Sequence, residues 1–131
     1  MKIEIFTDGG ALNNPGPAAI GIVIKYGNKL KTYAEKIKDS TNNQAEYQAL
    51  KFGLEEAIKS NVKKLHVYMD SLLVVNQLNG IYKVKNRDLL PIYESIKELL
   101  KKFREVTIEH VPREFNKLAD AEVNKALDSE L

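Results

Sequence analysis

The order of strand-like and helix-like segments limits the folds that this chain can adopt. Three strand-like segments come first, at residues 2–8, 19–26 and 29–37. Helical and strand-like patterns then alternate, giving a helix at 43–60, a strand at 64–69, helices at 71–79 and 88–103, a strand at 105–111 and a helix at 115–128. Strands joined through helices enter a sheet in parallel, by right-handed crossovers. The order therefore predicts an α/β fold, in which three antiparallel strands and two parallel ones form a mixed five-stranded sheet flanked by helices.

The connections between these segments are predicted from their glycine and proline content. Residues 9–18, GGALNNPGPA, hold three Gly and two Pro and are predicted to form a loop. Gly27 and Asn28 are predicted to form a two-residue turn. Residues 81–87, IYKVKNR, form a short basic connection. No segment has the composition of a linker, so residues 1–131 are expected to form one domain.

The composition excludes several classes of protein. The chain has 131 residues, of which 44% are hydrophobic, enough for a packed core. With 20 Lys plus Arg against 18 Asp plus Glu, the net charge of +2 permits nucleic-acid binding only if the basic residues are grouped. The absence of cysteine excludes disulfides and thiolate metal sites. No secretory signal pattern and no membrane-spanning apolar run are seen, so we expect a soluble cytoplasmic protein.

Four acidic residues lie at the ends of predicted strands or in predicted helices, and their placement favours a shared site. Asp8 and Asp70 end strand-like segments, Glu46 lies in the first helical pattern, and Asp120 lies in the last one. The carboxyl ends of parallel strands meet at one edge of a sheet, where α/β proteins bind ligands. Carboxylate oxygens suit hard divalent cations, and two such cations can stabilise both the attacking and the leaving oxygens of a phosphodiester. The sequence thus favours metal-dependent phosphoryl chemistry.

Each acid also has a plainer interpretation. Asp8 precedes two glycines and could belong to a turn, and Asp70 could cap the following helix. Asn43 and Glu46 have the spacing of a capping box. Asp120 could be an exposed helical residue.

The position of Glu46 argues for more than a cap, although the case for a site rests on all four acids meeting at one edge of the predicted sheet. It shares one helical line with Leu50, Gly53 and Ala57, and this line is expected to face the sheet. A buried acid is uncommon without a partner or a metal.

The chain resembles a type-1 ribonuclease H along its whole length. The motifs that carry the resemblance are FTDGGALNNPGPAAIG, STNNQAEYQAL, HVYMDS and HVPREFNKLADAEVNKAL. The resemblance implies endonucleolytic cleavage of the RNA strand of an RNA–DNA hybrid, with 5′-phosphate and 3′-hydroxyl ends. It also implies two Mg²⁺ ions, replaceable by Mn²⁺, held by Asp8, Glu46, Asp70 and Asp120. By analogy Asp8 bridges both ions, Asp120 completes the site for the attacking water, and Glu46 and Asp70 complete the site for the leaving oxygen.

The same resemblance assigns substrate contacts. Asn14, Asn42 and Asn43 match positions that contact the minor groove of the hybrid, where a 2′-hydroxyl distinguishes RNA from DNA. Thr41 with Asn43 resembles a pocket for a phosphate of the DNA strand. Local roles, in a turn and at a helix start, are compatible with these assignments. The resemblance adds Ser71, Arg113 and Asn116 to the substrate-binding residues.

One catalytic assignment has rivals. His110 has the spacing of the family's mobile histidine, which is thought to help protons move or product leave. Other members lack this histidine, so Arg113 and Glu114 are alternative candidates.

The chain also departs from many bacterial members. It has only IYKVKNR where they insert a basic helical handle, and Leu72 where many have a glutamine. Weaker hybrid binding, with Tyr82, Lys83, Lys85 and Arg87 as a reduced grip, is therefore expected.

Two further hypotheses remain open. The chain could be a binding module with this fold that does not cut, although none of the four acids is lost. A member without the handle could also cut double-stranded RNA, since both duplexes approach A-form geometry. We expect a monomer that does not associate with membranes.

Overall fold

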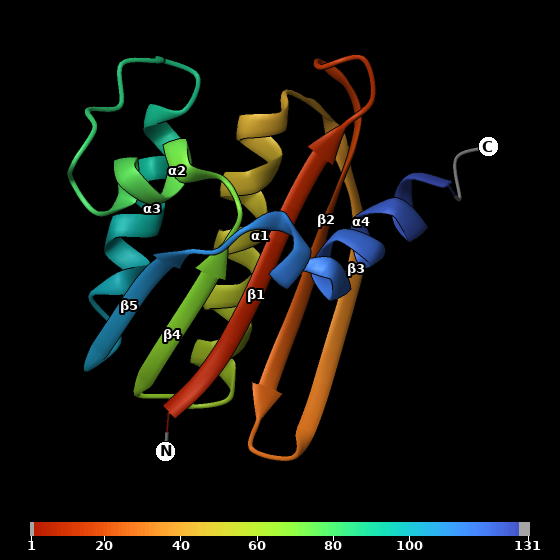
Figure 1. Cartoon of the computed structure of the whole chain (residues 1–131). Helices are drawn as coiled ribbons and strands as arrows, with labels where there is room; N and C mark the ends of the chain where they lie inside the picture. The colour runs from red at the N-terminus through yellow and green to blue at the C-terminus, as the bar shows by residue number, and fades with distance from the viewer. Residues whose placement is uncertain (1, 129–131) are drawn as a thin grey trace.

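A five-stranded sheet forms the centre of the computed structural model, which describes residues 2–128 (Figure 1). The strands are β1 (Lys2–Ala11), β2 (Gly16–Tyr26), β3 (Lys29–Ser40), β4 (Lys64–Met69) and β5 (Glu105–His110), and their order across the sheet is β3-β2-β1-β4-β5. Strands β1, β2 and β3 pair antiparallel, whereas β4 pairs parallel with both β1 and β5. The predicted α/β fold with a mixed sheet is confirmed.

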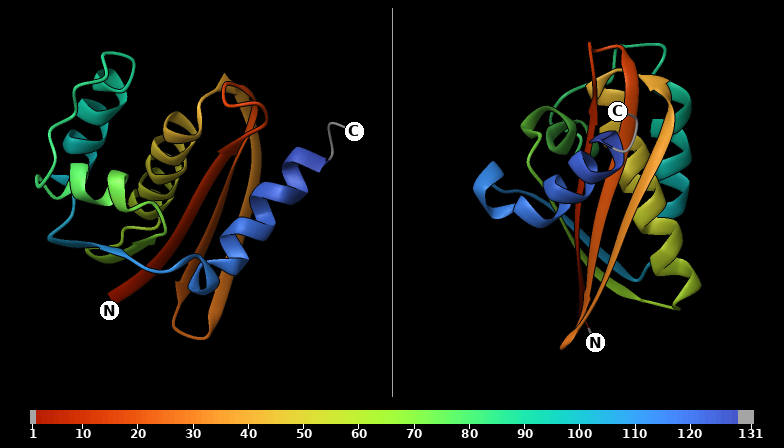
Figure 2. Two further views of the ribbon diagram at one scale, coloured as in Figure 1. Left: turned by 45° about the horizontal axis from the view of Figure 1, so that its top comes forward. Right: turned by 90° about the vertical axis from the view of Figure 1, so that its right-hand side faces the viewer.

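Helices cover both faces of this sheet. They are α1 (Asn42–Lys59), α2 (Leu72–Leu78), α3 (Leu90–Leu100) and α4 (Lys117–Asp128), and a short 3₁₀ turn, Arg113–Phe115, precedes α4. Helix α1 packs on β1 and β2, and α3 packs against α1, while α4 crosses the opposite face over β1, β2 and β3 (Figure 2). Within residues 2–128, none of the helices combines the length and the apolar character needed to cross a bilayer.

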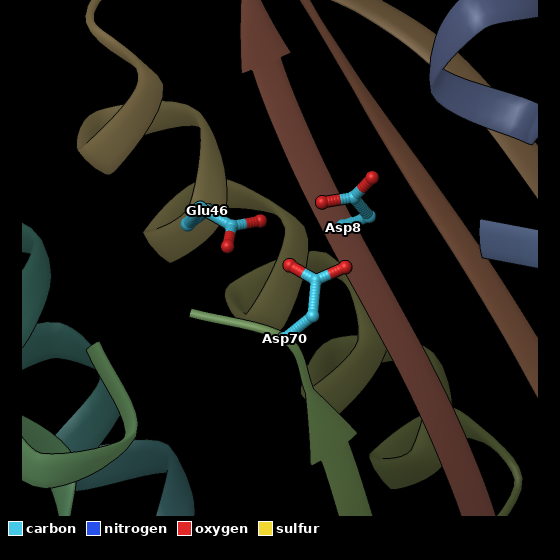
Figure 3. A group of neighbouring side chains, drawn as sticks. All are labelled: Asp8, Glu46 and Asp70. Carbon is cyan, nitrogen blue, oxygen red and sulfur yellow. The ribbon is translucent and has the colours of Figure 1, made fainter. Parts of the chain in front are cut away.

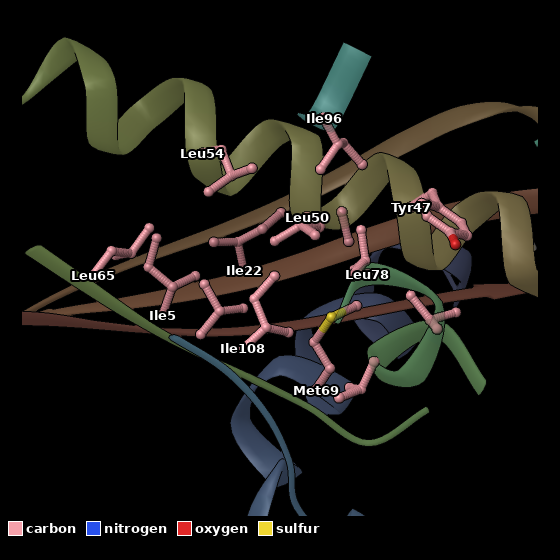
Figure 4. Close-up of a cluster of buried hydrophobic side chains, with 14 of the residues drawn as sticks. Ile5, Ile22, Tyr47, Leu50, Leu54, Leu65, Met69, Leu78, Ile96 and Ile108 are labelled. Carbon is pink, nitrogen blue, oxygen red and sulfur yellow. The ribbon is translucent and has the colours of Figure 1, made fainter. Parts of the chain in front are cut away.

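The main core lies between α1 and the sheet (Figure 4). Ile5 and Ile22 of the sheet and Leu50 and Leu54 of α1 are fully buried there. The absence of a side chain at Gly53 lets α1 approach the sheet closely, because a Cβ at this position would lie 3.3 Å from Ile5 Cγ2. A smaller cluster of Ala19, Val123, Ala126 and Leu127 packs α4 onto the other face.

The loop predicted for residues 9–18 is wrong. Strand β1 continues to Ala11 and β2 begins at Gly16, with Gly9 opposite Ile20 and Gly10 opposite Ala19, so that only residues 12–15 form the connection. Pairing with β2 overrides the turn preference of these glycines. The turn at Gly27 and Asn28 is confirmed, with Gly27 at a positive φ of 60°.

Several predicted ends also shift. The third strand runs on to Ser40, the third helix is shorter than 88–103, and the last helix begins at Lys117 after the 3₁₀ turn.

Candidate active site

Three carboxylates meet at the end of the sheet where β4 stops. Asp8 comes from β1, Glu46 from α1 and Asp70 from the residue after β4, and one oxygen of each lies within 4.8 Å of the other two (Figure 3). Asp8 is 8% exposed and Glu46 is 5% exposed, while Asp70 is half-buried. This arrangement joins three segments that are distant along the chain.

The sheet explains why two of these acids are neighbours. The last parallel pair of β1 and β4 is Thr7 with Met69, so Asp8 and Asp70 both follow the point at which the two strands separate. Helix α1 comes close to β1 there, because Gly9 has no side chain to hold it away. The Gly9 backbone N–H donates a 2.6 Å hydrogen bond to Glu46 Oε1, which holds the third acid beside the strand.

Asp120 stands at the side of this cluster, in the first turn of α4. Its Oδ1 lies 3.5 Å from Arg113 Nη2, and its Oδ2 accepts a 3.4 Å hydrogen bond from Asn124 Nδ2. Asp120 is outside the group of three, but it lines the same cleft of about 420 Å³ and contributes to raising the pKa of Asp8. The four acids predicted from the sequence therefore surround one cleft.

Burial and mutual repulsion make the ionised acids costly without a counter-ion. Burial, followed by the charge of Asp70, raises the pKa of Asp8 to about 7. Burial, followed by the charge of Asp8, raises the pKa of Glu46 well above its ordinary value. A divalent cation would offset this repulsion, and carboxylate oxygens are its preferred ligands. The residues present thus fit a metal centre at Asp8, Glu46 and Asp70, with Asp120 beside it.

The capping-box interpretation of Glu46 is wrong. The N-terminal cap of α1 is Thr41, whose Oγ1 accepts a 3.1 Å hydrogen bond from Gln44 N, while Gln44 Oε1 accepts a 2.8 Å bond from Thr41 N. Because Gln44 completes this box, Glu46 is not part of the cap; it lies two residues further along α1, where its carboxylate accepts the bond from Gly9 of β1.

The rim of the cleft is built from asparagines. Asn42 Oδ1 accepts a 2.8 Å hydrogen bond from Ala11 N, and Asn14 Oδ1 accepts one of the same length from Asn42 N. These bonds tie the 12–15 connection to the start of α1. Asn42 and Asn43 line the cleft, and Asn14 adjoins them.

Known proteins are similar to this chain in both sequence and fold. The family model described as reverse transcriptase-like matches residues 6–126. Ribonuclease HI of Halobacterium salinarum is 39% identical over 129 residues, which are 97% of this chain and 65% of that protein. The crystal structure of RNase H1 from that archaeon has a TM-score of 0.94 at 38% identity and covers 98% of this chain and 99% of that one. The chain belongs to the type-1 ribonuclease H family.

Two more comparisons bear on the ribonuclease H assignment. LC11-RNase H1, solved in complex with RNA/DNA hybrid, has a TM-score of 0.92 at 40% identity and covers 98% of each chain. A bifunctional protein of Mycobacterium tuberculosis is 42% identical over 132 residues, which are 98% of this chain and 36% of that protein. The chain therefore spans about a third of the length of this mycobacterial relative.

Other predicted residues of the ribonuclease H site lie at different depths. Ser71 caps α2 by accepting from Val74 N and lines the cleft. The Arg113 side chain is 80% exposed and reaches over the cleft to Asp120. His110 is the last residue of β5 and is exposed. It is not among the described residues that line the cleft.

Asn116 does not lie where a substrate contact was expected. It is 1% exposed, and its amide sits beneath Asp70. A side chain buried to this extent cannot present hydrogen-bonding groups to a duplex, so the assignment of Asn116 to direct substrate binding is corrected.

Two residues of the site were missed from the sequence. Gly9 supplies the backbone donor to Glu46, but its place in an Asp-Gly-Gly run indicated only a turn. Asn124 donates to Asp120 from the next turn of α4, and its i+4 spacing was an available signal.

The raised pKa of Asp8 predicts a pH-dependent stability for the metal-free protein. A carboxyl whose folded pKa lies above its unfolded value of 3.8 favours folding at low pH, and this contribution is lost as the pH rises towards 7. Between pH 4.5 and 8 the wild type should lose about 3 kcal/mol of unfolding free energy relative to Asp8→Asn, from the size of the pKa shift. Urea unfolding of both proteins in chelator would measure this. Parallel pH profiles would contradict the clustered-acid interpretation.

Proposed function

We propose that this protein is a metal-dependent endoribonuclease that hydrolyses the RNA strand of RNA–DNA hybrids and leaves 5′-phosphate and 3′-hydroxyl ends. The observation that carries the proposal is the cluster of Asp8, Glu46 and Asp70 at a cleft rimmed by asparagines. Membership of the ribonuclease H family supports the same chemistry. So does the likeness to LC11-RNase H1, whose structure contains RNA/DNA hybrid.

The four acids would hold two Mg²⁺ ions, for which Mn²⁺ would substitute. When bound, such ions stabilise the negative charge that develops on the phosphodiester oxygens as water displaces one ester oxygen from phosphorus. The protein contributes a preset arrangement of ligands: β1 and α1 fix Asp8 and Glu46 before substrate arrives, through the bond from Gly9 N to Glu46. Preset ligands avoid a reorganisation cost during the reaction.

Recognition of the hybrid would fall to the rim. Backbone N–H groups fix the Oδ1 atoms of Asn14 and Asn42, so the orientation of both amides is set before binding. Amides can bond to 2′-hydroxyls and base edges in the minor groove. Thr41 and Asn43 lie at the start of α1, where a helix N-terminus favours a phosphate of the DNA strand. Lys83, Lys85 and Arg87 are exposed in the 81–87 connection and would supply a modest electrostatic contact.

The roles of His110 and Arg113 can be separated by substitution. We expect His110→Ala to slow turnover by about 100-fold at saturating substrate while leaving some activity, since a group that assists proton transfer contributes to kcat. Arg113→Ala should act mainly through KM, because the guanidinium lies over the cleft and is not a metal ligand. Steady-state kinetics on hybrid would measure both. Unchanged rates in His110→Ala together with a large fall of kcat in Arg113→Ala would transfer the catalytic role to Arg113.

Cleavage of end-labelled substrates tests the proposal as a whole. Purified protein would be given RNA–DNA hybrid, double-stranded RNA and single-stranded RNA with Mg²⁺ or Mn²⁺. Internal cuts in hybrid alone are the expected result, and equal cutting of double-stranded RNA would widen the substrate class. Folded protein that binds hybrid without cutting it would replace the nuclease by a binding module.

A further inference from the structure

Asn116 joins three parts of the site through one side chain and one carbonyl. Its Nδ2 donates to Thr7 O at 2.9 Å and to Asp70 Oδ2 at 3.1 Å. Its backbone oxygen accepts from Asp120 N at 3.1 Å. The residue is thus in contact with the strand that carries Asp8, with Asp70 itself and with the turn that carries Asp120.

These bonds restrain Asp70, the most exposed of the three clustered acids. Asp70 follows the end of β4 and is half-buried, so rotation about its side-chain bonds could carry its carboxylate towards solvent, away from the repelling charge of Asp8. Nδ2 of Asn116 prevents this by binding Asp70 and Thr7 together. The spacing between Asp8 and Asp70 consequently depends on one neutral amide.

Burying the Asn116 amide lowers the stability of the fold in a way that burying an apolar side chain would not. Within residues 2–128, Asn116 Oδ1 is one of two buried side-chain polar atoms without a hydrogen-bond partner, the other being Thr7 Oγ1. A buried acceptor without a partner lowers the stability of the fold, because on folding it gives up its hydrogen bond to water. This cost is consistent with a residue that serves the site and not only the stability of the fold.

We propose that Asn116 is a positioning residue that holds Asp70 at the distance from Asp8 required for divalent-cation binding. The proposal rests on the proposed function in one respect, that the acids bind such cations. It differs from the earlier assignment of Asn116, because the residue acts through Asp70 and touches no substrate.

Calorimetric titration of Mn²⁺ into the metal-free protein tests this without any cleavage assay. Replacing a residue that hydrogen-bonds to a metal ligand typically weakens metal affinity by about 10- to 100-fold. We expect Asn116→Ala to weaken Mn²⁺ binding by that amount. Asn116→Ser keeps one hydroxyl donor and should give an intermediate loss. The matched control is Asn79→Ala, which removes a 3.0 Å bond from an asparagine amide to Ile108 O away from the cleft. It should leave Mn²⁺ affinity unchanged.

Additional measurements separate positioning from folding and from the proposed activity. Asn116→Ala should bind hybrid in chelator as the wild type does, and its cleavage rate should recover at higher Mn²⁺ concentration. Wild-type Mn²⁺ affinity in either folded Asn116 variant would overturn the proposal, as would a wild type that binds no divalent cation. If Asn116→Ala fails to fold, Asn116→Ser decides alone. A wild type that binds Mn²⁺ but cuts nothing would refute the nuclease, while the weaker binding by the Asn116 variants would still support positioning.

Discussion

Asp8→Asn is expected to lower the rate of Mg²⁺-dependent hybrid cleavage by at least about 100- to 1,000-fold, the range seen when one electrostatic contact to a transition state is removed. Asp8 is the acid with which the others interact: it forms the cluster with Glu46 and Asp70, and Asp120 adds to the rise of its pKa. An asparagine keeps the shape of the side chain and removes the charge that attracts a cation. The effect should therefore fall on activity and not on folding.

Stability measurements distinguish this from a general loss of structure. Removing a buried, repelled carboxylate should leave metal-free Asp8→Asn at least as stable as the wild type at pH 8. Asp88→Asn makes the same chemical change at an exposed position outside the cleft, and should keep the wild-type kcat. An Asp8→Asn protein that retains more than a tenth of the rate, about 1.4 kcal/mol in activation free energy, would contradict the metal-centre assignment.

Gly9→Ala should destabilise the fold by about 2–4 kcal/mol and impair the site at the same time. A Cβ at Gly9 would collide with the backbone carbonyl of Ala45 and approach Glu46 N, and α1 backbone cannot move aside as a flexible side chain can. Displacement of α1 would also break the bond from Gly9 N to Glu46 Oε1. Thermal unfolding and cleavage of hybrid would measure the two consequences.

The neighbouring glycine provides a matched control. At Gly10 an added Cβ would meet only Val123 Cγ1, at an ordinary contact distance of 3.5 Å. Gly10→Ala should therefore change stability by less than about 1 kcal/mol, the size of an ordinary glycine-to-alanine effect. Equal losses in both variants would show that strand conformation, and not the approach of α1, requires glycine here.

Local patterns were enough to predict the element order and the sheet. The alternation in 64–69 and the helical line of Leu50, Gly53 and Ala57 depend on residues a few positions apart, so the pattern can be seen within each element. Strand–helix–strand order then restricts the topology, because crossovers are right-handed. The types and order of the four acids were also available, through motifs that resemble one family.

Patterns failed where a local signal was overridden by strand pairing or where two neighbouring signals competed. Glycines at 9 and 10 favour a turn, yet pairing with β2 keeps them in a strand. Both Thr41 with Gln44 and Asn43 with Glu46 have capping spacing, and the structure selects the first. In the first case the deciding contact lies in another strand, and in the second it is the reciprocal pair of hydrogen bonds between Thr41 and Gln44.

By itself the sequence determined which elements form, how the sheet is connected and which acids could bind a cation. The tertiary structure alone decided that Asp120 stands beside the other three acids, that Arg113 reaches over the cleft while His110 does not line it, and that Asn116 is buried under Asp70. Periodicity records interactions between near neighbours in the chain. The site depends on hydrogen bonds across 37, 46 and 109 residues, and only packing of the whole chain brings those partners together.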